Sequence, residues 1–191
     1  MSTPGLQGPA EAAGITLLEL LLAVALLALL ATLGIPSFQR QLASSRLSAA
    51  ANDLGSALAL ARSQAIQKGV RFTVCRSLDQ SECDTGARDW STGWIVFQDD
   101  NGNRTREASE AITLVAHALP ADITARGNAP VASNVSFRPS GEALQAGTLR
   151  VCSSAAALGD SHRTSDLILT NSGRVVTVRS SPVLSTCPNP T

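Results

Sequence analysis

One carboxylate stands in the most apolar part of the chain. From Ile15 to Ile35 the only charged residue is Glu19, and from Leu20 to Leu33 the only polar residue is Thr32. Placing a carboxylate at the middle of a bilayer costs on the order of 3 kcal/mol, so Glu19 is a candidate functional group. The alternative is that Glu19 lies at the membrane interface and simply reaches water.

The four cysteines are Cys75, Cys83, Cys152 and Cys187. None forms a Cys-x-x-Cys pair and no histidine lies within five residues of one, so the spacing disfavours a zinc site. An even number of cysteines beyond a membrane segment indicates disulfides formed in an oxidising compartment. Of the three pairings, we favour Cys75–Cys83, which closes a short loop, with Cys152–Cys187, which ties the C-terminal tail to a strand.

Another set of oxygen-bearing side chains mimics a calcium loop. Asp99, Asn101 and Asn103 alternate, and a glutamate follows eleven residues after Asp99, as in an EF-hand. However, Arg104 occupies the place that requires glycine, and no helix is expected on either side. The pattern therefore favours a type I′ hairpin turn at Asn101-Gly102 and no metal.

No nucleophile, base and acid are grouped along the chain. The two histidines, His117 and His162, are isolated, and no Gly-rich phosphate loop is present. We therefore expect neither an enzyme nor a cofactor. With four Phe and no Tyr in the chain, Trp90 and Trp94 are expected to anchor the core.

The C-terminal stretch Ser172–Ser181 contains Arg174 and Arg179 and no acidic residue. Arginines bind phosphates without reading base sequence, so the stretch is a candidate for weak DNA binding, helped by Arg150 and Arg163. On a regular strand, however, Arg174 and Arg179 point to opposite faces. The alternative is a terminal strand pair with solvated arginines. Fifteen basic residues balance fifteen acidic ones, which excludes a globally basic nucleic-acid binder.

These groups need elements to hold them, and the first is a long helix. Ile15–Ile35 is long enough to cross a bilayer, and Pro36 is expected to kink the helix without ending it. A cleaved secretory signal peptide is disfavoured because no Lys or Arg precedes the apolar run. Beyond the proline, apolar residues recur at spacings of three and four up to Gly69, which predicts one helix from about residue 15 to residue 68. This stripe consists of Leu47, Ala50, Leu54, Leu58, Ala61 and Ala65.

The rest of the chain predicts β-strands. Seven short segments rich in Val, Ile, Leu or Phe are bounded by turn residues. They are Val70–Cys75, Gly93–Gln98, Ala111–Ala116, Asn134–Arg138, Thr148–Cys152, Asp166–Thr170 and Arg174–Val178. Such strands can bury one face against the helical stripe. The sequence thus predicts an α+β fold, with a long N-terminal helix packed on antiparallel β-sheet.

Several segments together resemble a known family. Gly14-Ile15-Thr16-Leu17-Leu18-Glu19, followed by an aliphatic run and Pro36, resembles the leader cleavage site and assembly helix of type IV prepilins. Further segments are similar to the FimT/FimU/GspH minor pilins, which have the pilin fold. These segments are Ala61–Ile66, Val74–Ser77, Trp90–Asp99, Phe137–Gly141 with Cys152, and Ser172–Arg174.

The resemblance implies a domain organisation and a processing step. Residues 1–14 would be the prepilin leader, 15–36 the transmembrane and assembly helix, and 37–191 the periplasmic globular domain, which includes the amphipathic half of the helix. A prepilin peptidase would cut between Gly14 and Ile15, and the new N-terminus would be methylated. Glu19 would be the fifth mature residue and would pair with a neighbouring N-terminus, which offsets its burial.

The resemblance also implies a function. The chain would be a minor pilin that primes or caps a type IV pilus, inserted in the bacterial inner membrane with its globular domain in the periplasm. Its partners would be other minor and major pilins. Some FimT-like proteins bind DNA through a Gly-Arg-x-Arg motif. Gly173-Arg174 is present here with Arg179 nearby, so a contribution to DNA uptake is a further expectation. The alternative is a GspH-like minor pseudopilin of a type II protein secretion system.

Overall fold

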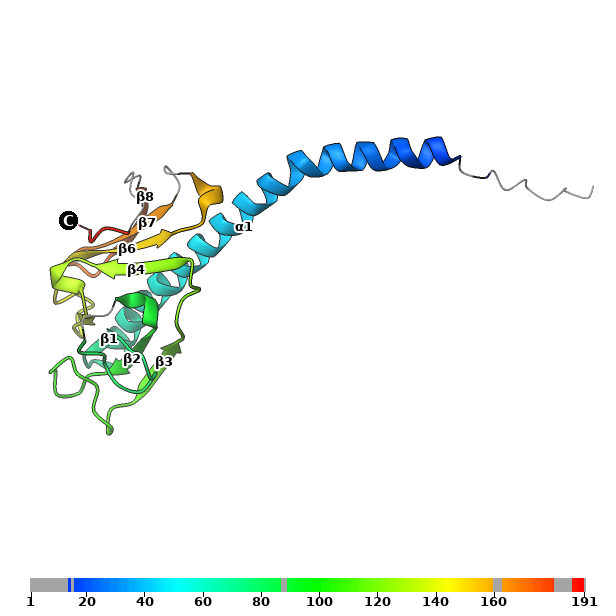
Figure 1. Ribbon diagram of the computed structural model, residues 1–191. Helices are drawn as coiled ribbons and strands as arrows, with labels where there is room; N and C mark the ends of the chain where they lie inside the picture. Colours follow the sequence, from blue (N-terminus) through cyan, green and yellow to red (C-terminus); the bar gives the residue numbers. More distant parts are fainter. Residues whose placement is uncertain (1–13, 15, 87–88, 160–162, 181–186, 191) are drawn as a thin grey trace, which may run out of the picture. The chain divides into compact units, whose positions relative to one another are not determined.

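The computed structural model describes residue 14 and residues 16–86, 89–159, 163–180 and 187–190 (Figure 1). It begins with one helix, α1 (Leu17–Lys68), and the strands that follow form two antiparallel sheets. The first sheet has the order β3-β2-β1-β5, with β1 (Phe72–Arg76), β2 (Trp94–Gln98), β3 (Ile112–Ala116) and β5 (Asn134–Phe137). The second has the order β4-β6-β7-β8, with β4 (Ile123–Gly127), β6 (Gly147–Ser153), β7 (Thr164–Leu169) and β8 (Val175–Ser180). The described residues also form the short 3₁₀ helices η1 (Trp90–Thr92), η2 (Ala129–Val131) and η3 (Ala156–Leu158).

Two compact units divide the chain. The N-terminal unit ends at Phe38, and the globular unit comprises Gln39–Thr191, so α1 contributes residues to both. The helix continues past Pro36, which therefore does not end α1. The predicted α+β fold, a long N-terminal helix with antiparallel sheets, is confirmed.

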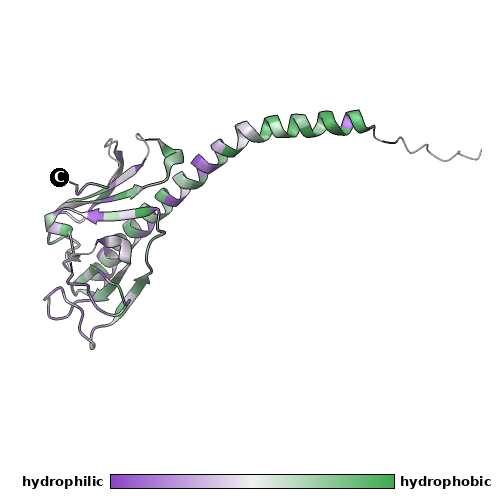
Figure 2. Cartoon of the chain, viewed as in Figure 1, coloured by the Kyte–Doolittle hydropathy of each residue, from purple (hydrophilic) through white to green (hydrophobic). Residues whose placement is uncertain are grey.

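In the N-terminal unit, α1 exposes its large apolar side chains. Leu17 is 77% exposed and Leu26 is 53% exposed, and in Figure 2 the ribbon of this half of the helix is coloured almost entirely as hydrophobic. Among the described residues, α1 is the helix that is long and apolar enough to cross a membrane. The hydroxyl of Thr32 donates to the Leu29 carbonyl at 2.7 Å, so this polar group is satisfied inside the helix, as lipid requires.

In the globular unit, α1 buries one face. All six residues of the predicted stripe lie in the main core, together with Ala43, Ala51 and Ala57. Small alanines let the sheets approach the helix closely, and larger side chains fill the remaining space. The largest are Trp90, Trp94, Phe72 and Phe137, all fully buried. The two tryptophans therefore anchor the core, as expected.

The inner strands β1 and β2 of the first sheet are buried on both faces, whereas the edge strand β3 is partly exposed. Every residue of β1 is buried, and its two faces meet different neighbours. Phe72 and Val74 face the main core, whereas Cys75 packs with Ile95 and Phe97 in a second cluster on the opposite face. The second cluster explains why these strands are almost continuously apolar rather than alternating.

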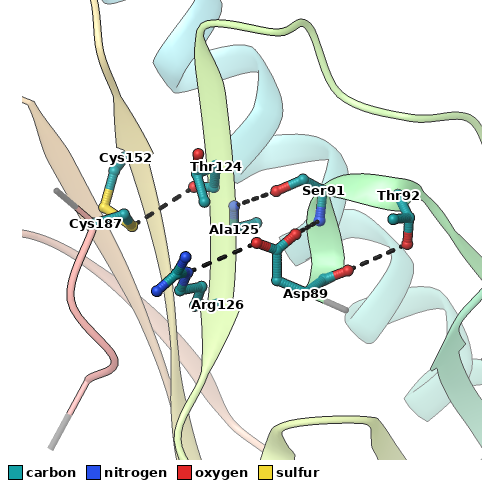
Figure 3. Close-up of polar contacts among 8 residues, drawn as sticks. All are labelled: Asp89, Ser91, Thr92, Thr124, Ala125, Arg126, Cys152 and Cys187. Carbon is teal, nitrogen blue, oxygen red and sulfur yellow. Dashed lines mark hydrogen bonds and ion pairs between the residues drawn. A yellow bond between two sulfur atoms is a disulfide. The ribbon is translucent and has the colours of Figure 1, made fainter. Parts of the chain in front are cut away.

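Side chains before β2 join the two sheets. Asp89 accepts a hydrogen bond from the Ser91 amide at 3.0 Å and caps η1, and it also forms an ion pair with Arg126 of β4 at 3.6 Å (Figure 3). The Ser91 hydroxyl accepts the backbone N–H of Ala125 at 2.8 Å. The outer edge of β4 is thereby covered by a side chain of η1, the 3₁₀ helix that precedes β2 of the first sheet.

Two local predictions were wrong. The strand β4 was not predicted, because Ile-Thr-Ala-Arg-Gly offers only one large apolar side chain and ends in glycine. The type I′ turn at Asn101-Gly102 is absent, since Gly102 has a positive φ but Asn101 does not. The connection from β2 to β3 instead spans residues 99–111.

Candidate functional site

The start of α1 is organised by Thr16. The Thr16 hydroxyl accepts the backbone N–H of Glu19 at 3.2 Å, and the Thr16 carbonyl accepts the N–H of Leu20 at 3.1 Å. Thr16 is thus the N-cap residue, and Thr-x-x-Glu is the sequence of a capping box. This arrangement puts Glu19 in the first turn of the helix, where the helix dipole favours negative charge. Of the predicted cleavage site, Gly14 is described, whereas Ile15 lies outside the described residues.

A second candidate site is built around Arg62 in the globular unit. The Nε of Arg62 donates to the Gly141 carbonyl at 2.9 Å, and its Nη2 donates to the Ser172 carbonyl at 3.0 Å. One guanidinium therefore holds two hairpin turns against α1. Three of the sequence segments that resemble the minor pilins meet at this point, although they lie 79 and 110 residues apart.

The glycines of these two turns allow the contact. Gly173 has a φ of 76°, and a Cβ atom there would lie 2.1 Å from the Gly141 carbonyl oxygen. Gly141 has a φ of 82°, and a Cβ there would lie 2.7 Å from the side chain of Ile66. The positive φ favours glycine at both positions, and Gly173 also requires it for space, because the atom that its Cβ would meet is a backbone oxygen. Gly173 thus has a structural role next to the candidate DNA-binding Arg174.

A groove of about 820 Å³ runs between α1 and β8. Small residues of α1 line one side, including Gly55, Ser56 and Ala59. The other side is lined by residues from Gly173 to Thr177, including the exposed Arg174. Arg179 lies farther along β8, is exposed, and its Nη2 lies 3.4 Å from the Ser48 hydroxyl of α1. The turn before β8 therefore places Arg174 on the groove, and Arg179 reaches toward the same helix.

Of the two predicted helpers of these arginines, Arg163 is half-buried directly before β7, and Arg150 lies on β6. Arg150 makes a two-pronged ion pair with Asp166, with contacts of 2.7 and 2.8 Å, and both side chains are largely buried. The carboxylate raises the pKa of Arg150 above its ordinary value by hydrogen bonding to the charged form. The two residues are direct cross-strand partners on β6 and β7, so the pair ties these strands together. The guanidinium of Arg150 is therefore engaged inside the protein.

Both favoured disulfides are present. Cys75–Cys83 closes an eight-residue separation at the end of β1, and Cys152–Cys187 joins β6 to the C-terminal tail across 35 residues. Figure 3 shows the second disulfide beside β4, where the Cys187 sulfur lies 3.9 Å from the Thr124 carbonyl. The C-terminal tail is thus fixed to the second sheet.

The calcium-like residues bind each other and the backbone of their own loop. Asp99 is almost fully buried and accepts hydrogen bonds from the Thr73 hydroxyl and the Arg104 amide. Glu107 accepts from the side-chain amides of Asn101 and Asn103. Within the described residues, no group of three His, Cys, Asp or Glu side chains is arranged to hold a metal. Of the isolated histidines, His162 lies outside the described residues.

Sequence reasoning missed three residues that organise these sites. Thr16 carried a readable signal, the capping-box spacing to Glu19. Arg62 lies in one of the segments that resemble the minor pilins, but no local pattern revealed its role, because its partners are backbone carbonyls in distant turns. Ser91 likewise acts on the backbone of a strand that was not predicted.

Comparisons with known proteins give one family match and several structural likenesses. The family model of the Type II transport protein GspH matches residues 50–179. Among solved structures, the chain is similar to the type IV minor pilin FimU of Pseudomonas aeruginosa, with 20% identity and a TM-score of 0.47 over 80% of this chain and 97% of that chain. It is also similar to the minor pseudopilin EpsH from the Type 2 Secretion System of Vibrio cholerae, with 14% identity and a TM-score of 0.48 over 70% of this chain and 97% of that chain. No curated protein sequence matches. The residues matched by the family model run from the buried face of α1 to the last strand of the second sheet.

Proposed function

Because the chain belongs to the GspH family of minor pilins and pseudopilins, we propose that it is a minor structural subunit of a type IV filament. The observation that carries the proposal is the start of α1. A Thr16-capped helix exposes an apolar surface long enough for a bilayer, and Glu19 is the charged residue in its first turn. Such a helix suits a single-pass anchor in the bacterial inner membrane, with the globular unit in the periplasm.

Processing would complete this assembly element. A prepilin peptidase would cut between Gly14 and Ile15, and the new amine, which is then methylated, would lie next to the cap residue Thr16. A neighbouring subunit's Glu19 can pair with that amine as the helices bundle. The pair offsets the cost of a carboxylate among apolar side chains and sets the register between subunits. Pro36, near the end of the apolar half, would adjust the helix where it leaves the membrane.

Within this function, the finer proposal is that the subunit primes or caps a type IV pilus. The second candidate is a minor pseudopilin of a type II secretion system, which the description of the matching family favours. Deleting the gene distinguishes them, because the first predicts loss of surface pili and the second predicts loss of exoprotein secretion with pili intact.

The processing test is direct. Membrane-extracted protein should have Ile15 as its N-terminal residue, carrying a methyl group detectable by mass spectrometry. The Gly14→Leu variant should retain the leader and remain in the membrane. An N-terminus elsewhere in the wild-type protein would contradict the proposal.

DNA binding is a secondary candidate, supported by the exposed Arg174 and Arg179. With Arg150 engaged by Asp166, few phosphate contacts remain, so binding would be weak and lost steeply with salt. Several copies in one filament would be needed for useful avidity. The test is a low-salt titration of the full chain with a DNA duplex, comparing wild type with the Arg174→Gln/Arg179→Gln double variant.

A further inference from the structure

The two edge strands of the second sheet, β4 and β8, differ in whether their outward backbone groups have hydrogen-bond partners. At β4, the outward N–H of Ala125 is bound by the Ser91 hydroxyl. At β8, no hydrogen bond in the described part of the chain reaches the outer edge. An open strand edge is a template for pairing with another chain, and proteins normally cover it. The groove between α1 and β8 lies along this open edge.

The pairing of β7 with β8 tells which backbone groups face outward. The Thr170 N–H donates to the Arg174 carbonyl at 3.0 Å, so this is a hydrogen-bonded pair of the antiparallel ladder. Such pairs alternate with pairs whose N–H and C=O groups point away from the partner strand. The N–H and C=O groups of Val175, Thr177 and Arg179 therefore face the open edge. Together they can accept one more strand.

The groove also has room for the side chains of an added strand. Its α1 side is made of small residues, including Ala51, Gly55 and Ala59. At Gly55 itself α1 packs closely on the second sheet, since a Cβ there would lie 3.3 Å from the side chain of Leu167, so the open space lies beside this contact, toward β8. Alternate side chains of a fifth strand would lie over this shallow surface.

The positive charge of the groove determines which kind of added strand would bind there. The described residues that line the groove include Arg62 and Arg174 and no acidic side chain, and Arg179 lies on the same strand beyond them. A β8 strand from a second copy would add its own Arg174 and Arg179 to a groove that is already positively charged, and the stretch Ser172–Ser181 supplies no acidic side chain. An extended segment with Asp or Glu at alternate positions would be attracted instead.

We propose that the β8 edge and the adjoining α1 groove bind an acidic extended segment of a neighbouring filament subunit, which adds to the second sheet as a fifth strand. Main-chain hydrogen bonds to Val175, Thr177 and Arg179 supply affinity, and Arg174 supplies preference for carboxylates. The proposal rests on the filament function proposed above and names the partner chemistry of one of its contact surfaces.

The test uses the processed full chain in nanodiscs and a fluorescein-labelled peptide, acetyl-Thr-Asp-Val-Glu-Val-Asp-Thr-amide, followed by fluorescence anisotropy. Saturable binding is expected. The Thr177→Pro variant removes one outward N–H and leaves the bonds to β7 intact, since proline is tolerated on an edge strand. It should weaken binding tenfold or more, whereas the matched control Thr177→Ala should change it less than threefold. Arg174→Gln should weaken it at least fivefold.

A second measurement leaves the protein unchanged and so is independent of any folding defect. The same peptide with N-methyl groups at alternate residues cannot donate along one edge, and it should bind at least tenfold more weakly. A peptide with Asn and Gln in place of Asp and Glu should also bind more weakly. Equal binding of the parent and N-methylated peptides would overturn strand addition.

A third arm separates nucleic acid from peptide. Binding of a single-stranded oligonucleotide, without peptide binding, would overturn the proposal and favour the DNA function. Normal processing at Ile15 and normal filament incorporation without peptide binding would refute the β8 proposal alone. Failure of processing would instead refute the filament function.

Discussion

Both halves of α1 are helical, but the first half exposes its apolar side chains, whereas the second half buries one face in the core of the globular unit. In the N-terminal unit, Leu26 is 53% exposed, and leucines around it are equally open. In the globular unit, Leu54 is 1% exposed, because both sheets cover its face of the helix. Burial of a leucine side chain is worth about 1.5–3 kcal/mol. The first half can obtain that energy only from lipid or from other subunits, whereas the second half obtains it from its own domain.

Substituting Glu19 tests the first half most strongly. We expect Glu19→Val to be inserted and cleaved normally but to reach sheared filaments at less than a tenth of the wild-type level. The charge is lost from the helix, so insertion does not suffer, but the pair with a neighbouring amine disappears. Asp53→Val, an exposed acid in the second half of α1, is the matched control and should assemble normally. Wild-type incorporation of Glu19→Val would reduce Glu19 to an interfacial residue.

Matched leucine truncations should separate the two halves thermodynamically. Leu58→Ala should lower the free energy of unfolding of the globular unit by about 2–5 kcal/mol, because it leaves a cavity under both sheets. Leu26→Ala should change it by less than about 0.5 kcal/mol. Urea unfolding followed by the fluorescence of the buried Trp90 and Trp94 measures both. Equal losses would show that the halves are not independent.

Removing the longer disulfide should affect only the globular unit. Cys152→Ser/Cys187→Ser should cost about 2–4 kcal/mol, since the bond closes a 35-residue separation. The same urea experiment reports the loss, and membrane extraction should show unchanged anchoring through the first half of α1. Loss of anchoring in this variant would contradict the division.

Two arginines of α1 provide a smaller test within the globular unit. Arg62→Ala should cost about 1–3 kcal/mol, because the Gly141 and Ser172 carbonyls each lose a charged donor. Arg62→Lys should recover only part, since an ammonium group cannot match the fork of the guanidinium. Arg40→Ala, an exposed arginine without such contacts in the described residues, should cost almost nothing.

Acid should produce the smallest effect, again confined to the globular unit. The backbone N–H groups of Glu82 and Ser81 hold the pKa of Asp79 well below its usual range. Asp79 therefore favours the folded state above its ordinary pKa of about 4, and this contribution is lost as the pH falls below that value. The urea midpoint should fall less between pH 6 and about pH 3 in Asp79→Asn than in wild type. An identical fall in both proteins would exclude Asp79 as a source of acid sensitivity.

The pattern of apolar residues was enough to predict the fold. In α1, a continuous apolar run indicates the exposed half, and apolar residues at spacings of three and four indicate the half that is buried on one face. The stripe from Leu47 to Ala65 has the spacing of a buried helix face, and the strands carry enough Val, Ile and Phe to be found. The strand β4 escaped because its Ala125 and Arg126 have little strand preference, and its place depends on pairing with β6 and on the Ser91 hydroxyl. A contact that forms across tens of residues leaves no local pattern.

The candidate site residues also divide into those with a local sequence pattern and those without one. Gly14, Glu19 and Pro36 stay predictions as processing and assembly residues, and they could be proposed from the sequence because their spacing before and along α1 is the signal. The role of Arg62 could not, since its acceptors are carbonyl groups that every residue has. Gly173 was singled out beside Arg174 for a binding role, yet its positive φ and its close approach to Gly141 show a structural requirement at that position.

The disulfide between Cys152 and Cys187 also bears on how the subunit responds to pulling. Both β7 and β8 lie inside the covalent loop that it closes. When a filament subunit is loaded through its helix, an unfolded chain lengthens by at most about 3.3–3.6 Å per residue released. The residues between the two cysteines cannot extend while the disulfide is intact. For a separation of 35 residues, this removes roughly 120 Å of extension. Under tension the unfolded globular unit would therefore extend less. The force would pass through the disulfide, so that β7 and β8, which lie inside the loop, would not be stretched.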